Sequence, residues 1–338
     1  MTSLLKLLAV ACGLAFVAAP AFAATQYPLT VTNCGLKVTF GKAPAKIVSI
    51  GQSMTEVLYA LGLSNKVVGT AVWFSPVLPQ FADVNSKIRR LADNEPSFES
   101  VVGQEPDLVA AEFEWHVGPQ GSVGKREQFS ALGINTYVSP ADCVAKVNDN
   151  GGDGVRKELF SMDLIYQEIA ELSEIFDVKD RGDALIADMK RREADAVASV
   201  ASVKMKNVPI VFWFSSKEVN GDAFIAGKNG APAYILKTLG ATNVVTTEEE
   251  WPLVGWETIS AANPAVIVMA DMDRRRYAAD NPKMKRDFLD HDPVTSQMAA
   301  VKDKRIVLMD AEAMSPSIRT VDGIEQLASA IKSFGLTQ

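Results

Sequence analysis

The chain has 338 residues, with 34 Lys and Arg against 41 Asp and Glu, a formal net charge of −7 and 48% hydrophobic residues. This acidic balance argues against a nucleic-acid-binding protein, which normally has a surplus of basic residues. Only two His are present, His116 and His291, so a three-His zinc site is excluded. The length allows two ordinary domains, each with enough apolar residues to form a core.

Residues 1–23 have the pattern of a secretory signal peptide. One Lys lies near the start, a run of Leu, Ala and Val follows, and residues 21–23 supply a small-x-small cleavage sequence. Pro20 ends the apolar run before the ~18 residues that a membrane-spanning helix needs. Lipidation at Cys12 is an alternative, but Ala replaces the Leu usually found three positions earlier. We therefore expect an exported protein.

Two cysteines, Cys34 and Cys143, follow the predicted leader. In an oxidising compartment an isolated pair of cysteines is more often bonded than free. We therefore predict a disulfide that ties the N-terminal segment to the region after Tyr137. Two buried free thiols are the alternative.

The first half of the chain alternates short apolar strands with helices, which predicts a parallel α/β layer. Strands are expected at residues 47–50, 66–70, 107–111 and 136–138. The helix after the first strand is expected to begin at a capping box formed by Ser53 and Glu56 and to end at Gly62.

The second half repeats this pattern, with strands expected at 209–214, 243–245, 265–270 and 305–309 and a helix at 231–239. In both halves a helix ends in Leu-Gly and a strand follows. Glu99 then precedes Pro106 by seven residues, and Glu257 precedes Pro264 by the same spacing. This ordered set of matches predicts two lobes of similar construction.

Residues 179–203 connect the two halves and are expected to form one long helix. Asp180 is a good N-cap, an apolar stripe runs along one face, and no Pro interrupts the segment. At 1.5 Å per residue this helix would be roughly 35 Å long. The predicted fold is α/β: two similar doubly wound lobes, each with a mainly parallel sheet, at 24–179 and 204–338, joined by one long α-helix at 180–203.

This organisation resembles the helical-backbone class of periplasmic substrate-binding proteins of ABC importers, which serve iron-siderophore, haem and cobalamin uptake. The segments that carry the resemblance are residues 46–62, 99–107, the connecting helix and 255–264. Residues 32–35 and 137–140 also resemble a subgroup that binds a deazaflavin-cofactor precursor.

The resemblance implies a monomeric periplasmic binding protein that performs no catalysis, binds no nucleic acid and needs no cofactor of its own. It would capture a metal chelate, with an iron-siderophore carrying Fe(III) as the first choice and cobalamin, haem or a deazaflavin precursor as alternatives. It would then deliver this ligand to an ABC permease in the inner membrane.

Two glutamates are implied as the contacts with that permease. In the family, one Glu on each lobe docks into arginine pockets of the permease, and Glu99 and Glu257 occupy the matching positions here. A rigid protein with two separated carboxylates can engage a two-fold permease with both lobes. The alternative is that each Glu is an ordinary solvated residue at a helix start.

Ligands of doubly wound lobes lie beyond the carboxyl ends of the strands, so the loops there are the candidate site. We expect ligand contacts from Trp73, Glu112, Trp115, His116, Trp213, Trp251, Arg275 and Arg319. The Trp side chains would cover flat groups of an organic ligand, and the Arg side chains would pair with its anionic oxygens. The alternatives are Trp packing beneath its own lobe and a solvated Arg run at 274–276.

Glu112 and His116 allow further interpretations. Glu112 with Glu114 would need more oxygen ligands to hold a hard cation. His116 would be an axial ligand of haem iron or a polar loop residue. The three Glu at 248–250 are interpreted as a solvated acidic turn, and no metal site of the protein's own is predicted.

Two other function classes fit less well. An exported metal-dependent hydrolase would use Glu112, His116 and Asp271 in the same cleft, but the chain is poor in His and has no G-x-S-x-G nucleophile motif. An adhesin-like domain would use the lobes for protein contact alone, and ligand-induced quenching of tryptophan fluorescence would distinguish a small-molecule binder from it.

Overall fold

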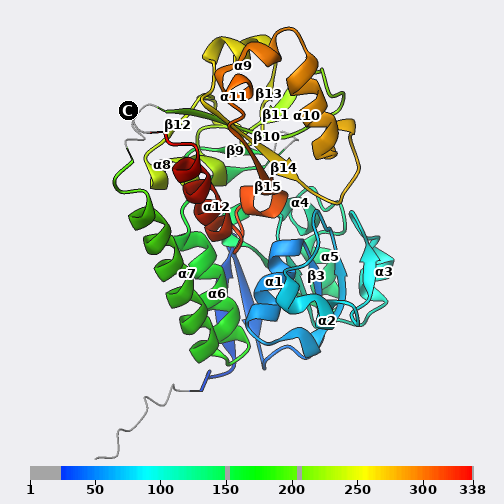
Figure 1. Cartoon of the computed structure of the whole chain (residues 1–338). Helices are drawn as coiled ribbons and strands as arrows, with labels where there is room; N and C mark the ends of the chain where they lie inside the picture. The colour runs from blue at the N-terminus through cyan, green and yellow to red at the C-terminus, as the bar shows by residue number, and fades with distance from the viewer. Residues whose placement is uncertain (1–23, 149–152, 204–207, 337–338) are drawn as a thin grey trace, which may run out of the picture.

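The computed structural model describes residues 24–148, 153–203 and 208–336. The predicted signal peptide, residues 1–23, lies outside the described residues. The chain folds into two α/β lobes, one above the other, with a long helix running along one side between them (Figure 1). This confirms the predicted fold class.

The N-terminal lobe contains a five-stranded parallel sheet in the order β5-β4-β3-β6-β7. Its strands are β3 (Ile47–Ile50), β4 (Val67–Ala71), β5 (Arg90–Ala92), β6 (Leu108–Ala111) and β7 (Asn135–Val138). Every residue of the central strand β3 is buried. A continuous apolar strand of this kind is typical of a parallel sheet covered on both faces.

Two antiparallel pairs in this part of the chain were not predicted. They are the hairpin β1 (Leu29–Asn33) with β2 (Leu36–Phe40), and β8 (Lys146–Val147) with β9 (Val155–Arg156). Their apolar content is low, so they lack the dense hydrophobic runs that mark the central strands in the sequence.

The N-cap of helix α1 (Gln52–Ala60) lies two residues before the predicted cap, Ser53, and the capping box is wrong. Gly51 is the N-cap with φ 118°, and a Cβ there would lie 2.2 Å from Cβ of Glu112. Ser53 lies inside the helix, where its N–H donates to Oε2 of Glu112 at 2.9 Å. A carboxylate from a neighbouring strand end therefore replaces the local cap, because it satisfies a free N–H of the first turn.

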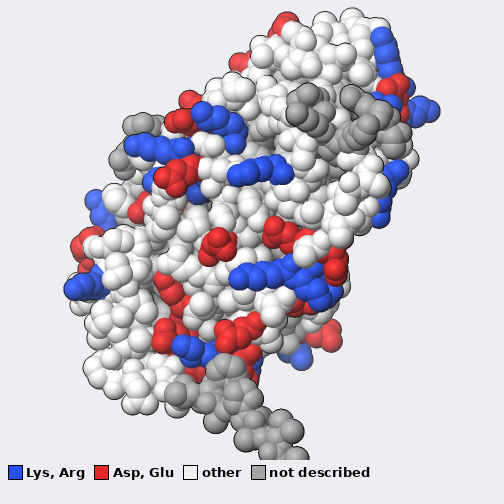
Figure 2. All heavy atoms as spheres, turned by 90° about the vertical axis from the view of Figure 1, so that its left-hand side faces the viewer, with Lys and Arg blue, Asp and Glu red and all other residues white. Residues whose placement is uncertain are grey.

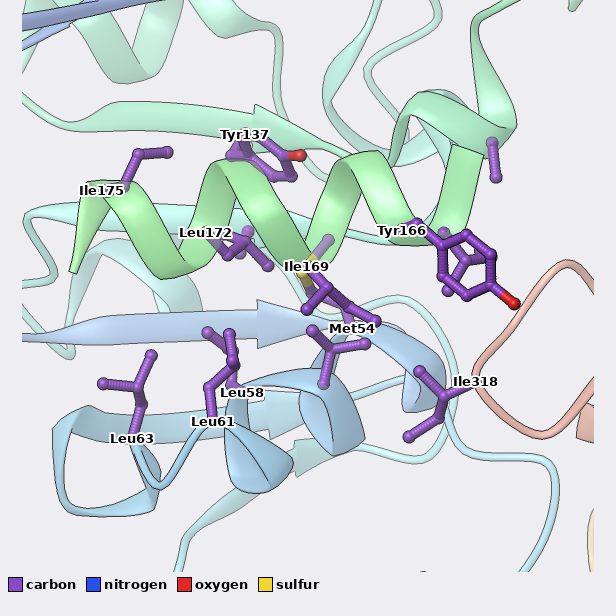
Figure 3. Packing of buried hydrophobic residues seen from close by; sticks show 14 of the residues in the cluster. Met54, Leu58, Leu61, Leu63, Tyr137, Tyr166, Ile169, Leu172, Ile175 and Ile318 are labelled. Carbon is purple, nitrogen blue, oxygen red and sulfur yellow. The ribbon is translucent and has the colours of Figure 1, made fainter. Parts of the chain in front are cut away.

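One of the two apolar clusters of the N-terminal lobe lies between α1 and α6 (Asp163–Ile175), and the other lies on the opposite face of the sheet. Figure 3 shows Ile169 and Leu172 of α6 facing Met54 and Leu58 of α1. Ile318, from the other lobe, packs into the same cluster. The remaining short helices of this lobe are α2 (Ala82–Asn85), α3 (Phe98–Val102), α4 (Glu114–Val117) and α5 (Arg126–Ala131).

The C-terminal lobe has a mixed sheet in the order β13-β11-β10-β14-β15, with β12 also paired to β10. The strands are β10 (Pro209–Ser216), β11 (Ala223–Ile225), β12 (Thr242–Asn243), β13 (Leu253–Val254), β14 (Val266–Asp271) and β15 (Ile306–Asp310). Strand β10 pairs in parallel with β12 and β14, and β14 pairs in parallel with β15. Strand β11 pairs antiparallel with both β10 and β13.

Helices cover both faces of this second sheet. They are α8 (Ala231–Leu239), α9 (Trp256–Ala262), α10 (Pro282–His291), α11 (Ala299–Lys302) and α12 (Thr320–Ser333). Helices α8 and α12 contribute to one apolar cluster, and α9, α10 and α11 to the other. The two clusters lie on opposite sides of β10, because successive side chains of a strand point to opposite faces.

Helix α7 (Lys179–Ser199) is the predicted connector, but it begins before Asp180 and ends at Ser199. Two of its residues hold it in place. Arg192 forms ion pairs with two acids of α12. Glu193 accepts hydrogen bonds from Tyr234 of α8 at 2.6 Å and from Tyr166 of α6 at 3.5 Å. The helix is therefore bonded to both lobes.

The predicted disulfide between Cys34 and Cys143 is confirmed, with a Cα–Cα distance of 5.6 Å. It joins the β1–β2 turn to the loop that follows β7. Along the described chain, no helix combines the length and the apolarity that crossing a membrane requires.

Acidic and basic side chains are intermixed in small groups on the face that lies at the left of Figure 1 (Figure 2).

Candidate functional site

A cavity of about 520 Å³ opens between the two lobes. Its walls come from the loops after β4 and β5 of one lobe and from the loop after β14 of the other. The lining residues are Trp73, Phe74, Ser75, Pro76, Arg90, Asp93, Asn94, Glu95, Asp273, Arg274, Arg275 and Arg276. This is the carboxyl edge of parallel strands, where ligands of open α/β sheets bind.

Aromatic rings and arginines are combined in the cavity wall. The guanidinium of Arg90 lies 4.8 Å from the ring centroid of Trp73, and that of Arg274 lies 4.2 Å from the ring of Phe74. Both distances fall within the range of cation–π attraction. Three acids, Asp93, Glu95 and Asp273, also line the cavity, and Asp93 pairs with Arg90 at 3.1 Å. The wall therefore combines guanidinium groups over flat apolar surface with acidic groups, and the guanidinium groups suit an organic ligand that carries anionic oxygens.

The same aromatic surface crosses from one lobe to the other. Phe74 lies edge-on to Phe214 of the C-terminal lobe, with 6.2 Å between ring centroids, and Phe214 contacts Trp251 at 5.0 Å. The backbone N–H groups of Asp273 and Arg274 both donate to the carbonyl of Phe74, at 2.8 and 3.0 Å. The lobes thus touch at the edge of the cavity.

Trp213 does not reach this cavity, so its predicted ligand contact is wrong. Its side chain is completely buried and packs against Trp256 and Phe288 on the far side of the sheet. The next residue of β10, Phe214, faces the cleft instead. The alternation of side chains along a strand explains the one-residue difference.

Arg319 is also wrong as a free ligand contact, because its guanidinium already has partners. It is buried and pairs with Glu56 of α1 through Nε at 2.8 Å and through Nη2. It also pairs with Asp310 at 3.1 Å and donates to the carbonyl of Pro76 at 2.7 Å. Arg319 therefore joins the C-terminal lobe to the N-terminal lobe.

Glu248 and Glu249 are exposed, as interpreted, but Glu250 is not solvated, because it forms a second buried ionic contact between the lobes. Glu250 is buried and pairs with Lys146 at 2.8 Å and with Arg156 at 3.2 Å. Lys146 also pairs with Asp142. A pair of buried cations thus holds the pKa of Glu250 below its usual range, in spite of burial.

Glu112 and His116 are both buried beside the cleft. Burial raises the pKa of Glu112, and the neighbouring Glu312 carboxylate raises it further. Burial lowers the pKa of His116 to about 4, and the carboxylate of Glu95, a cavity residue, opposes this shift. His116 is therefore neutral at physiological pH and is not the polar loop residue of the alternative interpretation.

The other predicted contacts are divided between the cavity and its surroundings. Trp73 and Arg275 line the cavity. The guanidinium of Arg275 donates to the carbonyls of Met272 and Arg274. Trp251 reaches the cleft through Phe214, whereas Trp115 is 43% exposed on α4 and is absent from the cavity lining.

A profile of the family described as "Periplasmic binding protein" matches residues 47–313. The chain belongs to this family. A solved periplasmic binding protein from Veillonella parvula has a TM-score of 0.73 and 23% identity, and the match covers 92% of this chain and 98% of that chain.

Two further proteins are similar to this chain along most of its length. A solved structure described as an ABC-type Fe3+-hydroxamate transport system from Saccharomonospora viridis has a TM-score of 0.71 and 25% identity over 90% of this chain and 99% of that chain. The vitamin B12-binding protein of Vibrio cholerae is 23% identical over 85% of this chain and 89% of its own length.

An ABC transporter substrate-binding lipoprotein of Bacillus subtilis, named as uncharacterized, is 27% identical over 90% of this chain and 86% of its own length.

The binding protein presents Glu99 and Glu257 at equivalent places. Each is exposed in the first turn of a short helix, α3 or α9, and the two helices belong to different lobes (Figure 1). A negative side chain is favoured there by the helix dipole.

Two buried acids beside the cleft were missed by the sequence reasoning. Glu312, in the 3₁₀ helix η6 (Ala311–Met314), follows strand β15 as Glu112 follows β6. The strand-end rule that singled out Glu112 would also have found Glu312. Glu168, on α6, carried no signal, because an acid on an amphipathic helix is expected to face solvent.

Proposed function

We propose that this protein is the substrate-binding component of an ABC importer, and that it captures a metal chelate, an iron-siderophore carrying Fe(III), between its lobes in the periplasm. The observation that carries the proposal is the cavity between the lobes, where Arg90 and Arg274 lie over aromatic rings. A ferric chelate combines flat or apolar groups with anionic oxygens, and this wall complements both.

The relatives support this choice of ligand. One solved relative is described as part of an Fe3+-hydroxamate transport system, and it covers 90% of this chain. Cobalamin is the second candidate, because the Vibrio cholerae relative is a vitamin B12-binding protein. In either case the ligand would bring its own metal coordination, and the protein would perform no chemistry on it.

Delivery would use the two exposed glutamates. Glu99 and Glu257 project from different lobes, so a permease with two-fold symmetry would contact both lobes at once. Carboxylate–arginine pairs at such a contact are directional and bidentate, which favours one docking geometry.

The binding step is testable by titration of intrinsic tryptophan fluorescence. Trp73 and Trp251 lie at the cavity and its aromatic edge, so we expect ferric hydroxamate chelates to quench emission with a saturable Kd in the micromolar range or tighter, about −8 kcal/mol. Cyanocobalamin and haem serve as the comparison ligands. No response to any of the three classes would contradict the proposed function.

A matched pair of variants locates the site in that titration. Phe74→Ala removes a cavity residue and should weaken binding. Phe98→Ala, on α3, removes a Phe that packs in the N-terminal lobe against Phe129 and should leave the affinity unchanged. Equal affinities in the two variants would place the ligand elsewhere.

A further inference from the structure

Six acidic side chains are buried between the lobes, and three of them have basic partners. Glu56 pairs with Arg319, Asp142 pairs with Lys146, and Glu250 pairs with both Lys146 and Arg156. The other three, Glu112, Glu168 and Glu312, form no ion pair with any residue in the described ranges, although each is at most 3% exposed.

These three acids also have free acceptor atoms. Oε1 of Glu112, Oε1 of Glu168 and both carboxylate oxygens of Glu312 are buried without a hydrogen-bond partner among the described residues. The remaining oxygens of the first two accept from the N–H of Ser53 and from the hydroxyl of Ser139. Burial of unpartnered carboxylate oxygens is costly, so it calls for a specific explanation.

The three acids lie together at the cleft. None of them is in the cavity lining, but contacts connect them to it. Glu112 accepts from Ser53 of α1, and Glu168 accepts from Ser139, whose N–H donates to Ala111, the residue before Glu112. The N–H of Glu312 donates to Asp310, which pairs with Arg319, and Arg319 donates to the carbonyl of Pro76 in the cavity wall. The carboxylates of Glu312 and Glu168 each raise the pKa of Glu112. Glu112 and Glu312 also come from different lobes, so a group held by both would bridge the cleft.

We propose that Glu112, Glu168 and Glu312 form an acidic floor of the inter-lobe cleft that receives a positively charged, hydrogen-bond-donating group of the ligand, such as a protonated amine. This inference rests on the proposed function. The arginines at the cavity mouth would donate hydrogen bonds to the oxygen-rich chelating end, and the amine would point inward. The ligand class is then a chelate with an oxygen-rich metal-binding end and a cationic end, which disfavours the dianionic haem.

This arrangement predicts that the number of protons bound by the protein changes when the ligand binds. Without ligand, burial and neighbouring acids raise the pKa of Glu312 to about 8 and that of Glu168 to about 7, so at neutral pH Glu312 is mostly protonated and Glu168 is partly protonated. An ammonium group placed beside them favours the ionised carboxylates. Binding of the cationic ligand is therefore coupled to proton release.

The test uses two probes that differ by one charge: ferric desferrioxamine B, which has a free ammonium group, and its N-acetylated neutral analogue. Calorimetric titrations are run in two buffers of different ionisation enthalpy. We expect the cationic chelate to bind at least about tenfold more tightly and to release protons. In Glu112→Gln/Glu312→Gln the preference should fall to within about twofold, whereas Glu218→Gln, an exposed surface change, should preserve it.

Fe(III) without chelator, cyanocobalamin and haem complete the panel. Equal binding of both chelates, or tighter binding of the acetylated one, overturns the inference and leaves the proposed function standing. Binding confined to bare Fe(III), cobalamin or haem overturns the inference together with the siderophore assignment. Binding of nothing in the panel overturns the proposed function, and the inference with it. The comparison of the two chelates on the unmodified protein does not depend on whether the variant folds.

Discussion

The exposed and the buried glutamates of this protein illustrate two opposite uses of one side chain. Glu99 and Glu257 stand in water at the first turns of helices on different lobes. Glu56, Glu250 and Glu312 are buried where the lobes meet. An exposed carboxylate keeps its charge at little cost, whereas a buried one must be paired or protonated.

This difference separates contact with a partner from contact between the lobes. The exposed pair adds nothing to the internal packing and is available to another protein. The buried acids either join the lobes, through Arg319 and Lys146, or lie at the cleft without a basic partner. Changes to the first group should therefore affect delivery, and changes to the second should affect stability, closure and ligand choice.

The largest expected effect is on uptake. Glu99→Ala combined with Glu257→Ala should abolish transport in cells while leaving the ligand affinity and the melting temperature of the purified protein unchanged. Glu127→Ala, an exposed acid in the first turn of α5, is the matched control and should transport normally. Transport at the normal rate by the double variant would refute the docking role.

The next effect is on folding. Arg319→Ala leaves the buried Glu56 without its cation, so the free energy of unfolding should fall by about 3–5 kcal/mol. Arg90→Ala removes an exposed cavity arginine and should cost no more than about 1 kcal/mol. Denaturant unfolding measures the loss of stability in each variant. Equal losses in the two variants would contradict the structural role of the Arg319–Glu56 ion pair.

Adjacent residues of β10 give a sharper contrast. Trp213→Ala removes a completely buried ring and should destabilise the protein by about 3–5 kcal/mol. Phe214→Ala, at the cleft, should cost less stability and weaken chelate binding by about tenfold. Denaturant unfolding and fluorescence titration of both variants check this. Weaker binding in Trp213→Ala together with the larger loss of stability in Phe214→Ala would show that Trp213, and not Phe214, faces the cleft.

The most gradual effect is the pH dependence of stability. Burial raises the pKa of Glu312 to about 8 from an ordinary value of 4.5, so the folded protein binds a proton that the unfolded chain gives up. Stability should therefore be highest at low pH within this range and fall as pH rises from about 4.5 to 8. The slope is at most about 1.4 kcal/mol per pH unit.

Glu312→Gln keeps the shape of the side chain and removes this titration, so unfolding midpoints between pH 5 and 8 should vary less than in the unmodified protein. Glu99→Gln should leave the pH profile as it is. A steeper dependence in Glu312→Gln would contradict the assigned sign.

Much of the fold follows from local pattern in the sequence. The strand at residues 47–50 and the helix at 231–239 have the predicted bounds, because dense apolar runs and terminal Gly residues define them. The short strands β11 and β13 and the hairpin β1–β2 were not predicted, since short, partly exposed strands carry little periodicity.

The site was less predictable, because it depends on long-range pairing. The strand-end rule located loops that line the cavity between the lobes, and Trp73 and Arg275 are among the lining residues. The rule does not tell to which face of the sheet a side chain near a strand end points. For this reason Trp213 was predicted at the cleft, where Phe214 lies instead. Nor does it reveal that Arg319 meets Glu56 across a separation of 263 residues.

The most direct test of the central claim is native mass spectrometry, with elemental analysis, of the protein isolated from its own periplasm under iron limitation. The account predicts a population that carries one organic ligand with one iron atom per chain, and loss of that ligand in Phe74→Ala. Recovery of a ligand that contains no metal, or of ligand-free protein that also ignores added ferric chelates, would contradict it.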